Sequence, residues 1–288
     1  MTAQTLSVFQ SLWAMEGLPW RGAAPWSLEE QIEHVAEAGF AGVGIDTYSL
    51  DRAPRPATIA PLLRAAGLRT TVTAFVTETR PLAAGLEYAA AVDAELVVVC
   101  GQVFPDEVAE AAELVRSWMK EAAAAGIPFH LETHRYTLTN DLSFTARLVQ
   151  EVPEVELALD LSHYVVANEL PDQPDQRVDE LIGGLLDRGS SLQGRVGTRE
   201  QVQVQLEFPQ HRPAVERFRG WWERGFRSWR ARATADADCV FLCELGTVPY
   251  AITGPDGVEL SDRWHEALLL KSWAEELFAA SIATPLEG

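Results

Sequence analysis

Lysine is scarce in this sequence. The 288-residue chain has 23 basic residues, of which only Lys120 and Lys271 are lysines, both within stretches of helical periodicity. Covalent catalysis through a Schiff base needs a lysine in the active site. A Walker-type phosphate loop needs a Gly-Lys-Ser or Gly-Lys-Thr step, which the sequence lacks. The nearest approach to a dinucleotide fingerprint, Gly42-Val-Gly44, has no third glycine. These absences argue against lysine-based catalysis and against a Rossmann cofactor site.

Cysteine and long apolar runs are scarce as well. Cys100, Cys239 and Cys243 are odd in number and lie in apolar, strand-like runs, which predicts buried thiols rather than a disulfide framework. No run approaches the roughly 18 apolar residues of a membrane helix, and the first residues lack the basic start and apolar core of a secretory signal. We therefore expect a cytoplasmic protein that does not associate with membranes.

Acidic residues outnumber basic ones, 42 against 23, and the formal net charge is −19. Such a chain repels nucleic acid, so we expect no nucleic-acid partner. Residues 212–232 are rich in arginine and aromatic side chains, but Phe218, Trp222, Phe226 and Trp229 recur at intervals of four, four and three. This spacing predicts a helix that packs an apolar stripe against the core. A homo-oligomer interface on the same segment remains an open alternative.

Short β-rich runs alternate with segments of helical periodicity along the whole chain. The expected strands are residues 6–12, 41–46, 69–76, 96–101, 128–133, 156–161, 191–196 and 240–245. The expected helices are residues 27–38, 58–66, 81–92, 106–125, 141–151, 177–188, 213–231 and 261–280. Eight βα units without a linker predict one α/β domain over residues 1–288, a single (β/α)8 TIM barrel with its active site at the C-terminal ends of the strands. An open doubly wound sheet is the alternative, but it usually begins with a glycine-rich turn.

Carboxylates interrupt three of the apolar strands near their ends. Glu132 lies on the fifth strand, Asp160 on the sixth and Glu244 on the eighth. Three ionised carboxylates at one barrel mouth would repel one another, which a divalent cation would relieve. Such oxygen-rich coordination favours Mn²⁺, Mg²⁺ or Co²⁺, and an imidazole ligand would admit Zn²⁺. For each acid taken singly, a helix N-cap or an ion pair is the alternative.

Other polar residues flank these acids. His134 and His163 are expected at the mouth with functional roles, whereas His130 is expected deeper in its strand as a core histidine with its hydrogen bonds satisfied. The seventh strand offers the amide of Gln193 and the guanidinium of Arg195. Cys239 and Cys243 have the opposite strand parity to Glu244 and are expected to face the helices.

The chain resembles the xylose isomerase-like barrel superfamily, the sugar phosphate isomerase/epimerase group that is also labelled apurinic endonuclease family 2. The segments that carry the resemblance are SLEEQIEHVAEAGFAGVGID, HLETHRYTLTND, LALDLSHYVV, QGRVGTREQVQV and FLCELGTVPY. The resemblance implies one divalent metal ion bound by Glu132, Asp160, Gln193 and Glu244, and substrate contacts from His163 and Arg199.

Gln193 stands where the family has a metal-binding histidine. The amide is a weak ligand for Zn²⁺, so it either favours Mn²⁺ or Mg²⁺ or loosens the site, and His134 is an alternative source of imidazole. The DNA-repair branch uses a three-metal cluster that needs many histidines. With six histidines and an acidic composition, this chain is not expected to be an endonuclease.

The resemblance implies a metal-dependent isomerase or epimerase that moves a proton on a sugar-like or polyol-like small molecule through an enediolate. Glu132 and Glu244 would transfer the proton. His134, His163, Arg195, Arg199 and Trp13 would contact the substrate, and Phe75 would join Trp13 in an apolar wall. A lyase or dehydratase acting through the same intermediate and a non-catalytic barrel subunit are the alternatives. Metal analysis of the purified protein would separate the enzyme hypotheses from the last.

Overall fold

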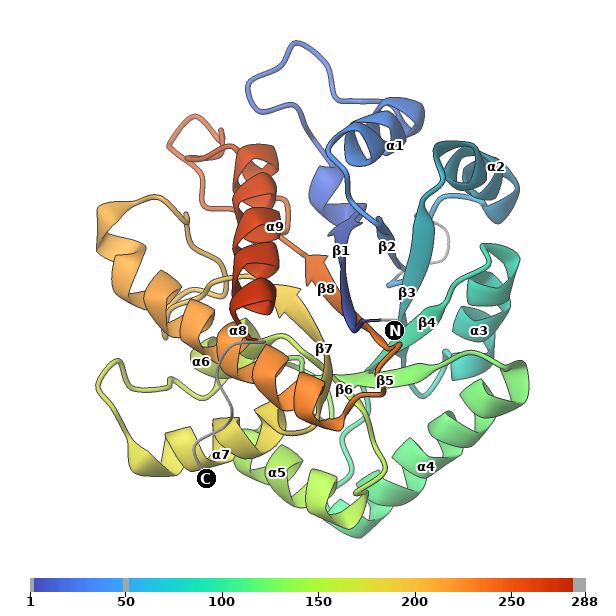
Figure 1. The fold of residues 1–288 in the computed structure, drawn as a ribbon, viewed down its shortest axis with the longest axis vertical. Helices are drawn as coiled ribbons and strands as arrows, with labels where there is room; N and C mark the ends of the chain where they lie inside the picture. Colours follow the sequence, from blue (N-terminus) through green and yellow to red (C-terminus); the bar gives the residue numbers. More distant parts are fainter. Residues whose placement is uncertain (1–2, 49–51, 282–288) are drawn as a thin grey trace.

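The computed structural model describes residues 3–48 and 52–281 of the chain. Eight parallel strands form a closed barrel in the order β1 to β8, each hydrogen-bonded to its sequence neighbours and β8 to β1 (Figure 1). The strands are β1 (Thr5–Ser11), β2 (Gly42–Asp46), β3 (Arg69–Val76), β4 (Leu96–Gly101), β5 (Phe129–Glu132), β6 (Leu157–Leu159), β7 (Gly189–Gly194) and β8 (Asp238–Cys243). The predicted (β/α)8 TIM barrel is confirmed.

Helices surround the barrel on its outer side (Figure 1). They are α1 (Leu28–Glu37), α2 (Pro56–Ala66), α3 (Leu82–Ala91), α4 (Val108–Ala125), α5 (Leu142–Glu151), α6 (Leu161–Ala167), α7 (Gln176–Leu186), α8 (Arg212–Arg232) and α9 (Arg263–Ala280), with short 3-10 turns η1 (Trp13–Met15) and η2 (Pro209–His211). None of the helices in the described ranges is both long and apolar enough to span a bilayer.

Three strand ends lie two residues before the predicted end, and the differences position the site. The sixth strand ends at Leu159 instead of residue 161, because Asp160 is the N-cap of a helix, α6. This helix was not predicted, because its apolar sequence follows directly after the apolar strand. The seventh and eighth strands each lie two residues earlier than expected, with Gln193 paired to Leu242 and Gly194 to Cys243. Arg195 and Glu244 therefore follow directly after the ends of β7 and β8.

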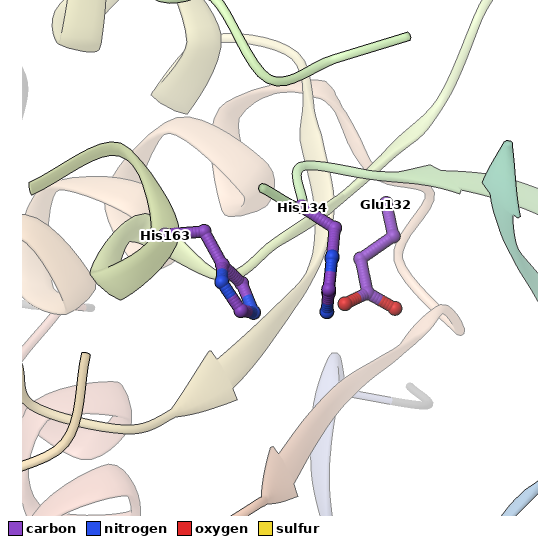
Figure 2. A group of neighbouring side chains, drawn as sticks. All are labelled: Glu132, His134 and His163. Carbon is purple, nitrogen blue, oxygen red and sulfur yellow. The ribbon is translucent and has the colours of Figure 1, made fainter. Parts of the chain in front are cut away.

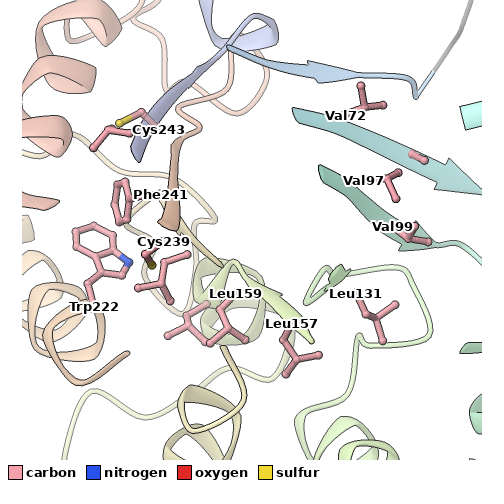
Figure 3. Packing of buried hydrophobic residues seen from close by; sticks show 14 of the residues in the cluster. Val72, Val97, Val99, Leu131, Leu157, Leu159, Trp222, Cys239, Phe241 and Cys243 are labelled. Carbon is pink, nitrogen blue, oxygen red and sulfur yellow. The ribbon is translucent and has the colours of Figure 1, made fainter. Parts of the chain in front are cut away.

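The core between barrel and helices contains the apolar stripe predicted for α8. Phe218, Trp222, Phe226 and Trp229 are all buried. The Trp222 ring lies with its centroid 5.4 Å from that of Phe241 on β8 (Figure 3). The centroid of the Phe226 ring lies 6.0 Å from that of Phe241. Packing against the barrel thus accounts for the aromatic content of this helix.

The cysteines of β8 are buried in the same layer (Figure 3). The Cys243 thiol donates a hydrogen bond of 3.7 Å to the carbonyl oxygen of Ala267 on α9, so this side chain faces the helices as its strand parity predicted. Cys100, Cys239 and Cys243 are all free and buried. Burial raises the pKa of the Cys239 and Cys243 thiols, which keeps them protonated.

Candidate active site

A cavity of about 460 Å³ opens at the C-terminal ends of the strands. Its wall includes Asp46 at the end of β2, Glu132 at the end of β5 and Glu244 after β8. Of the residues predicted for the site, six line this cavity: Trp13, Phe75, Glu132, His134, Arg195 and Glu244. Its volume lies within the range of small-molecule sites, which is roughly 300–1,000 Å³.

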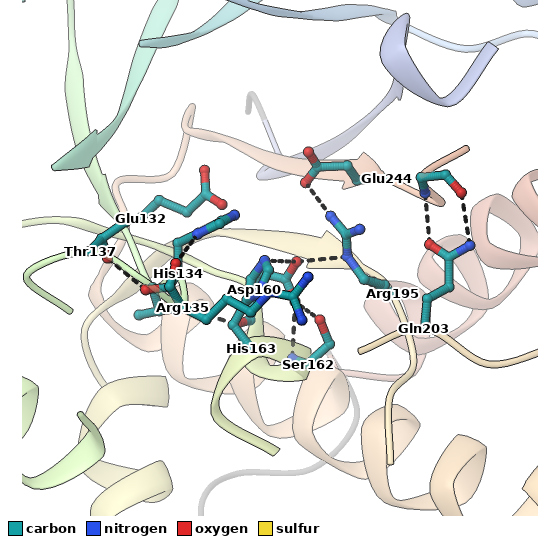
Figure 4. A network of polar contacts seen from close by, with 12 residues as sticks. Glu132, His134, Arg135, Thr137, Asp160, Ser162, His163, Arg195, Gln203 and Glu244 are labelled. Atoms are coloured by element: carbon teal, nitrogen blue, oxygen red, sulfur yellow. Dashed lines mark hydrogen bonds and ion pairs between the residues drawn. The ribbon is translucent and has the colours of Figure 1, made fainter. Parts of the chain in front are cut away.

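Arg195 lies between two of the three predicted acids (Figure 4). Its Nε lies 2.9 Å from Oδ2 of Asp160, and its Nη2 lies 3.2 Å from Oε2 of Glu244. All three side chains are buried, with Arg195 only 2% exposed. Burial alone would lower the pKa of Arg195, but Asp160 and Glu244 raise it above its ordinary value. The guanidinium is therefore charged and neutralises part of the acidic mouth.

Trp13 and Tyr250 flank the same guanidinium, with ring centroids 5.6 and 4.9 Å from its Cζ atom. The two rings meet edge to face at 5.0 Å. A side chain at Gly246 would collide with Trp13, because a Cβ atom there would lie 2.2 Å from the indole. Gly246 thus allows Trp13 to lie against the loop that follows β8 and to hold Arg195 in place.

Both carboxylate oxygens of Asp160 have partners. Oδ1 accepts hydrogen bonds from the backbone N–H and the hydroxyl of Ser162, at 2.9 and 2.5 Å, which caps α6. Oδ2 faces Nε of Arg195 and lies 3.4 Å from Nε2 of His163. Asp160 therefore combines a capping role with an ion pair.

Glu132 differs from Asp160 in that no cation pairs with it in the described structure. Burial raises the pKa of Glu132 to about 8, with Asp160 and Asp46 adding to the shift. Its Oε2 atom and Oε1 of Gln193 are buried without a hydrogen-bond partner among the described residues. Burial, together with Glu132 and Asp46, also raises the pKa of Glu244, although Arg195 acts in the opposite direction. Two carboxylates of high pKa therefore face one cavity.

Glu132, His134 and His163 form a group in which one ligand atom from each lies within 4.8 Å of the others (Figure 2). The two imidazole rings are 3.8 Å apart at their centroids. Nδ1 of His134 lies 2.5 Å from the carbonyl oxygen of Arg135, so Nδ1 carries the proton and Nε2 presents its lone pair. Burial lowers the pKa of His134 to about 4 and that of His163 well below its ordinary value. Both rings are neutral near pH 7, as metal ligands must be.

Two of the predicted residues, Arg199 and His130, lie apart from this group, whereas the ring of Phe75 meets that of His134 edge to face at 5.9 Å. Arg199 is outside the set of described residues that line the cavity, and it pairs with Glu169 at 3.4 Å and Glu200 at 3.3 Å near the surface. His130 lies 2.8 Å from Ser191 and 3.2 Å from Glu156. The prediction that His130 is a core histidine with its hydrogen bonds satisfied is confirmed.

Sequence reasoning missed Asp46 and Tyr250. Asp46 ends the apolar β2 run, the same pattern that had revealed Asp160, so the signal was present. Burial raises the pKa of Asp46 to about 6, although Arg195 acts to lower it. Tyr250 comes from the irregular loop after β8, where no periodicity indicates which side chain turns inward.

Comparisons with known proteins agree with this architecture. The family model described as xylose isomerase-like TIM barrel matches residues 32–185. No curated protein matches the chain. A xylose isomerase-like TIM barrel protein from Mycobacterium smegmatis, solved in complex with magnesium, is 14% identical with a TM-score of 0.58, covering 98% of this chain and 100% of that one.

Two further solved structures are similar. A D-tagatose 3-epimerase-like protein is 13% identical with a TM-score of 0.59, covering 96% of this chain and 100% of that one. A sugar phosphate isomerase/epimerase from Parabacteroides distasonis is 12% identical with a TM-score of 0.56, covering 99% and 98%. At such identities the likeness shows a shared fold. With the family match over half of its length, the chain belongs to the xylose isomerase-like TIM barrel family.

Proposed function

We propose that this protein is an isomerase or epimerase that moves a proton next to the carbonyl group of a sugar-like or polyol-derived small molecule. The observation that carries the proposal is the pair of buried carboxylates, Glu132 and Glu244, that face one cavity from β5 and from the end of β8. Each has its Oε2 atom buried without a hydrogen-bond partner within the described ranges. Oε2 of Glu244 nevertheless lies within ion-pair distance of Arg195, 3.2 Å from its Nη2.

Two carboxylates of raised pKa suit the two halves of such a reaction. One removes a proton from the carbon beside the carbonyl, and the other returns a proton to the neighbouring position or to the opposite face. Because burial raises the pKa of both groups, each exchanges protons nearer to neutral pH than an exposed carboxylate would. Glu132 and Glu244 approach from β5 and β8, so a substrate between them is open to attack from two sides.

The rest of the cavity suits a polyhydroxylated molecule. Gln31, Asp46 and Gln102 offer hydrogen-bonding groups, while Trp13, Tyr48, Phe75 and Tyr250 supply aromatic surface. Small-molecule sites commonly combine apolar walls with a few polar groups that fix orientation. Arg195 lies in the same wall and would bind a carbonyl or enolate oxygen of the substrate. His134 and His163 would lie near that oxygen.

A divalent ion fits Glu132, His134 and His163, because these residues offer a carboxylate and two neutral imidazoles. Glu132 belongs both to this trio and to the set of metal ligands predicted from the sequence, which is Glu132, Asp160, Gln193 and Glu244. The two sets differ in which other mutations should weaken metal binding. Mixed nitrogen and oxygen donors suit Mn²⁺, Co²⁺ or Zn²⁺ better than Mg²⁺. When bound, the ion would withdraw electron density from the substrate carbonyl and favour loss of the neighbouring proton.

The test is proton exchange in D₂O. Ketopentoses, ketohexoses and cyclic polyol ketones are incubated with the Mn²⁺-loaded protein and followed by NMR. We expect deuterium at the carbon beside the carbonyl together with a new stereoisomer or positional isomer. Glu132→Gln and Glu244→Gln should each abolish this exchange, because each variant lacks one proton-transfer group.

Exchange at the wild-type rate in both variants, with Mn²⁺ still bound, would contradict the proposed roles. A product that lacks the elements of water would instead identify a dehydratase acting through the same intermediate. A wild-type protein that neither exchanges protons nor binds Mn²⁺ would support the non-catalytic barrel.

A further inference from the structure

The acidic mouth already contains one cation of its own. Arg195 spans Asp160 and Glu244 with two different nitrogen atoms, at 2.9 and 3.2 Å. Asp160 is completely buried and Glu244 is 5% exposed, so solvent does not screen these contacts. Elsewhere at the mouth, Oε2 of Glu132 and Oε1 of Gln193 are buried oxygen atoms without hydrogen-bond partners in the part of the chain that the structure describes.

We propose that Arg195 acts as an internal counter-ion that occupies the cation position between Asp160 and Glu244 and excludes a divalent ion from these two carboxylates. The inference concerns the same site as the proposed function but does not depend on which reaction occurs there. It confines metal binding in the native protein to Glu132, His134 and His163.

The exclusion follows from charge and from space. A divalent ion bound by Asp160 and Glu244 would have to displace the guanidinium, since Arg195 contacts one oxygen of each. The displaced guanidinium would lose its ion pairs, and the rings of Trp13 and Tyr250 lie against it. A charged group that loses its partners in a buried position is strongly disfavoured.

The same reasoning predicts what happens when Arg195 is removed. Asp160 and Glu244 would then present carboxylate oxygens to the buried position that the guanidinium had filled. Carboxylate and amide oxygens are good ligands for Mn²⁺ and Mg²⁺. A variant without the guanidinium should therefore gain affinity for a divalent ion, and the gain should depend on Asp160.

The experiment measures Mn²⁺ binding by titration calorimetry and by electron paramagnetic resonance on metal-stripped protein at about pH 8. We expect Arg195→Met to bind Mn²⁺ at least tenfold more tightly than the wild type, or to bind a second ion. The double variant Arg195→Met/Asp160→Asn should lose that gain. Arg69→Met is the matched control, because Arg69 also contacts two carboxylates, Asp238 and Glu95, but with a side chain 40% exposed. Its Mn²⁺ affinity should stay within twofold of the wild type.

The second part of the experiment uses single substitutions in protein that retains Arg195. Asp160→Asn changes a contact of His163 but removes no ligand of the proposed site. It should therefore weaken the Mn²⁺ affinity of the wild type far less than Glu132→Gln, which should weaken it at least tenfold. A folded Arg195→Met variant without any gain would overturn the inference, and so would an Asp160→Asn variant that weakens Mn²⁺ binding as much as Glu132→Gln. If Arg195→Met folds only with Mn²⁺ present, the inference is supported. If it does not fold at all, the Asp160→Asn measurement decides.

Discussion

At the base of the barrel, where the strands begin, charged side chains have partners and partial access to solvent. Arg69 at the start of β3 pairs with Asp238 at 2.9 Å and with Glu95 at 3.3 Å, and it also donates to the Ser7 hydroxyl. His130 is held between Ser191 and Glu156. Several of these contacts link strands that are not neighbours, since Arg69 on β3 reaches β1 and β8 and His130 on β5 reaches β7. The contacts at the base therefore stabilise the closed barrel.

At the mouth, where the strands end, charge is buried more deeply and is paired less completely. Arg195 pairs with Asp160 and Glu244, but Glu132, Gln193 and Glu244 each keep a buried oxygen without a hydrogen-bond partner among the described residues. Unpartnered buried polar atoms reduce stability, so their concentration at one end indicates a site that a ligand completes. Comparison of the two ends therefore separates residues that hold the barrel together from residues that act on a ligand.

The largest expected effect concerns turnover. Glu132→Gln removes a proton-transfer group at the mouth and should lower turnover by about 10³-fold, within the range for loss of general acid–base catalysis. Glu156→Gln changes a glutamate at the base, beside His130, and should leave turnover within twofold. Steady-state kinetics of both variants, on the substrate that the exchange assay identifies, test the contrast. Equal losses in both variants would show that the two ends do not differ in this way.

Stability should show the next largest difference. Arg195→Met leaves two buried carboxylates without their cation and should lower the free energy of unfolding by about 3–5 kcal/mol in metal-free protein. Arg69→Met removes ion pairs of a partly exposed side chain and should cost about 1 kcal/mol or less. Urea unfolding of both variants measures the two values. A cost for Arg69→Met that matches the cost for Arg195→Met would remove the distinction between deeply and partly buried charge.

Metal affinity should depend on pH through Glu132. Its pKa in the metal-free protein is about 8, so below that pH each bound ion must displace one proton. The Mn²⁺ affinity should therefore rise about tenfold per pH unit up to about pH 8 and then level off. His134 has a pKa of about 4 and that of His163 is also low, so neither ring adds to the slope above pH 5. Calorimetric titrations between pH 5.5 and 8.5 should find this slope of one, and a flat profile would contradict the role of Glu132.

The same ionisation links stability to pH in metal-free protein. Glu132 has a pKa of about 8 when folded, against an ordinary value of 4.5. Between these values the folded chain binds more protons than the unfolded chain, so Glu132 makes the free energy of unfolding fall as the pH rises from about 4.5 to 8. Glu132→Gln should reduce this slope, which urea unfolding at several pH values would detect.

The sequence was sufficient to predict the barrel and most of the acids at its mouth. Glu132, Asp160 and Glu244 each interrupt an apolar run, a local signal that survives errors of one or two residues in a strand boundary. The same signal at Asp46 was present but was overlooked. These residues could be predicted because a strand of a parallel barrel is buried on both faces and polar residues are rare within it.

The pairing at the mouth could not be predicted from the sequence. Arg195 and Glu244 follow the ends of β7 and β8, and beyond a strand end the two-residue alternation no longer tells which way a side chain points. The contact between His134 and His163 depends on α6, whose apolar sequence had been assigned in part to the strand before it. Both arrangements result from tertiary contacts between segments that are distant in the sequence.

The smallest expected effect concerns Arg199, for which sequence and structure lead to different expectations. The family resemblance predicts that Arg199 contacts the substrate, whereas the structure pairs it with Glu169 and Glu200, two exposed residues. Because such surface pairs contribute little, Arg199→Gln should change KM by less than twofold and the free energy of unfolding by less than about 0.5 kcal/mol. Arg195→Lys supplies the contrast, because lysine keeps the charge at the cavity wall but cannot form the two-pronged contact with Asp160 and Glu244. A large rise in KM for Arg199→Gln, with stability unchanged, would show that the loop after β7 moves to bring Arg199 onto the substrate. The substrate site would then include residues beyond the strand ends.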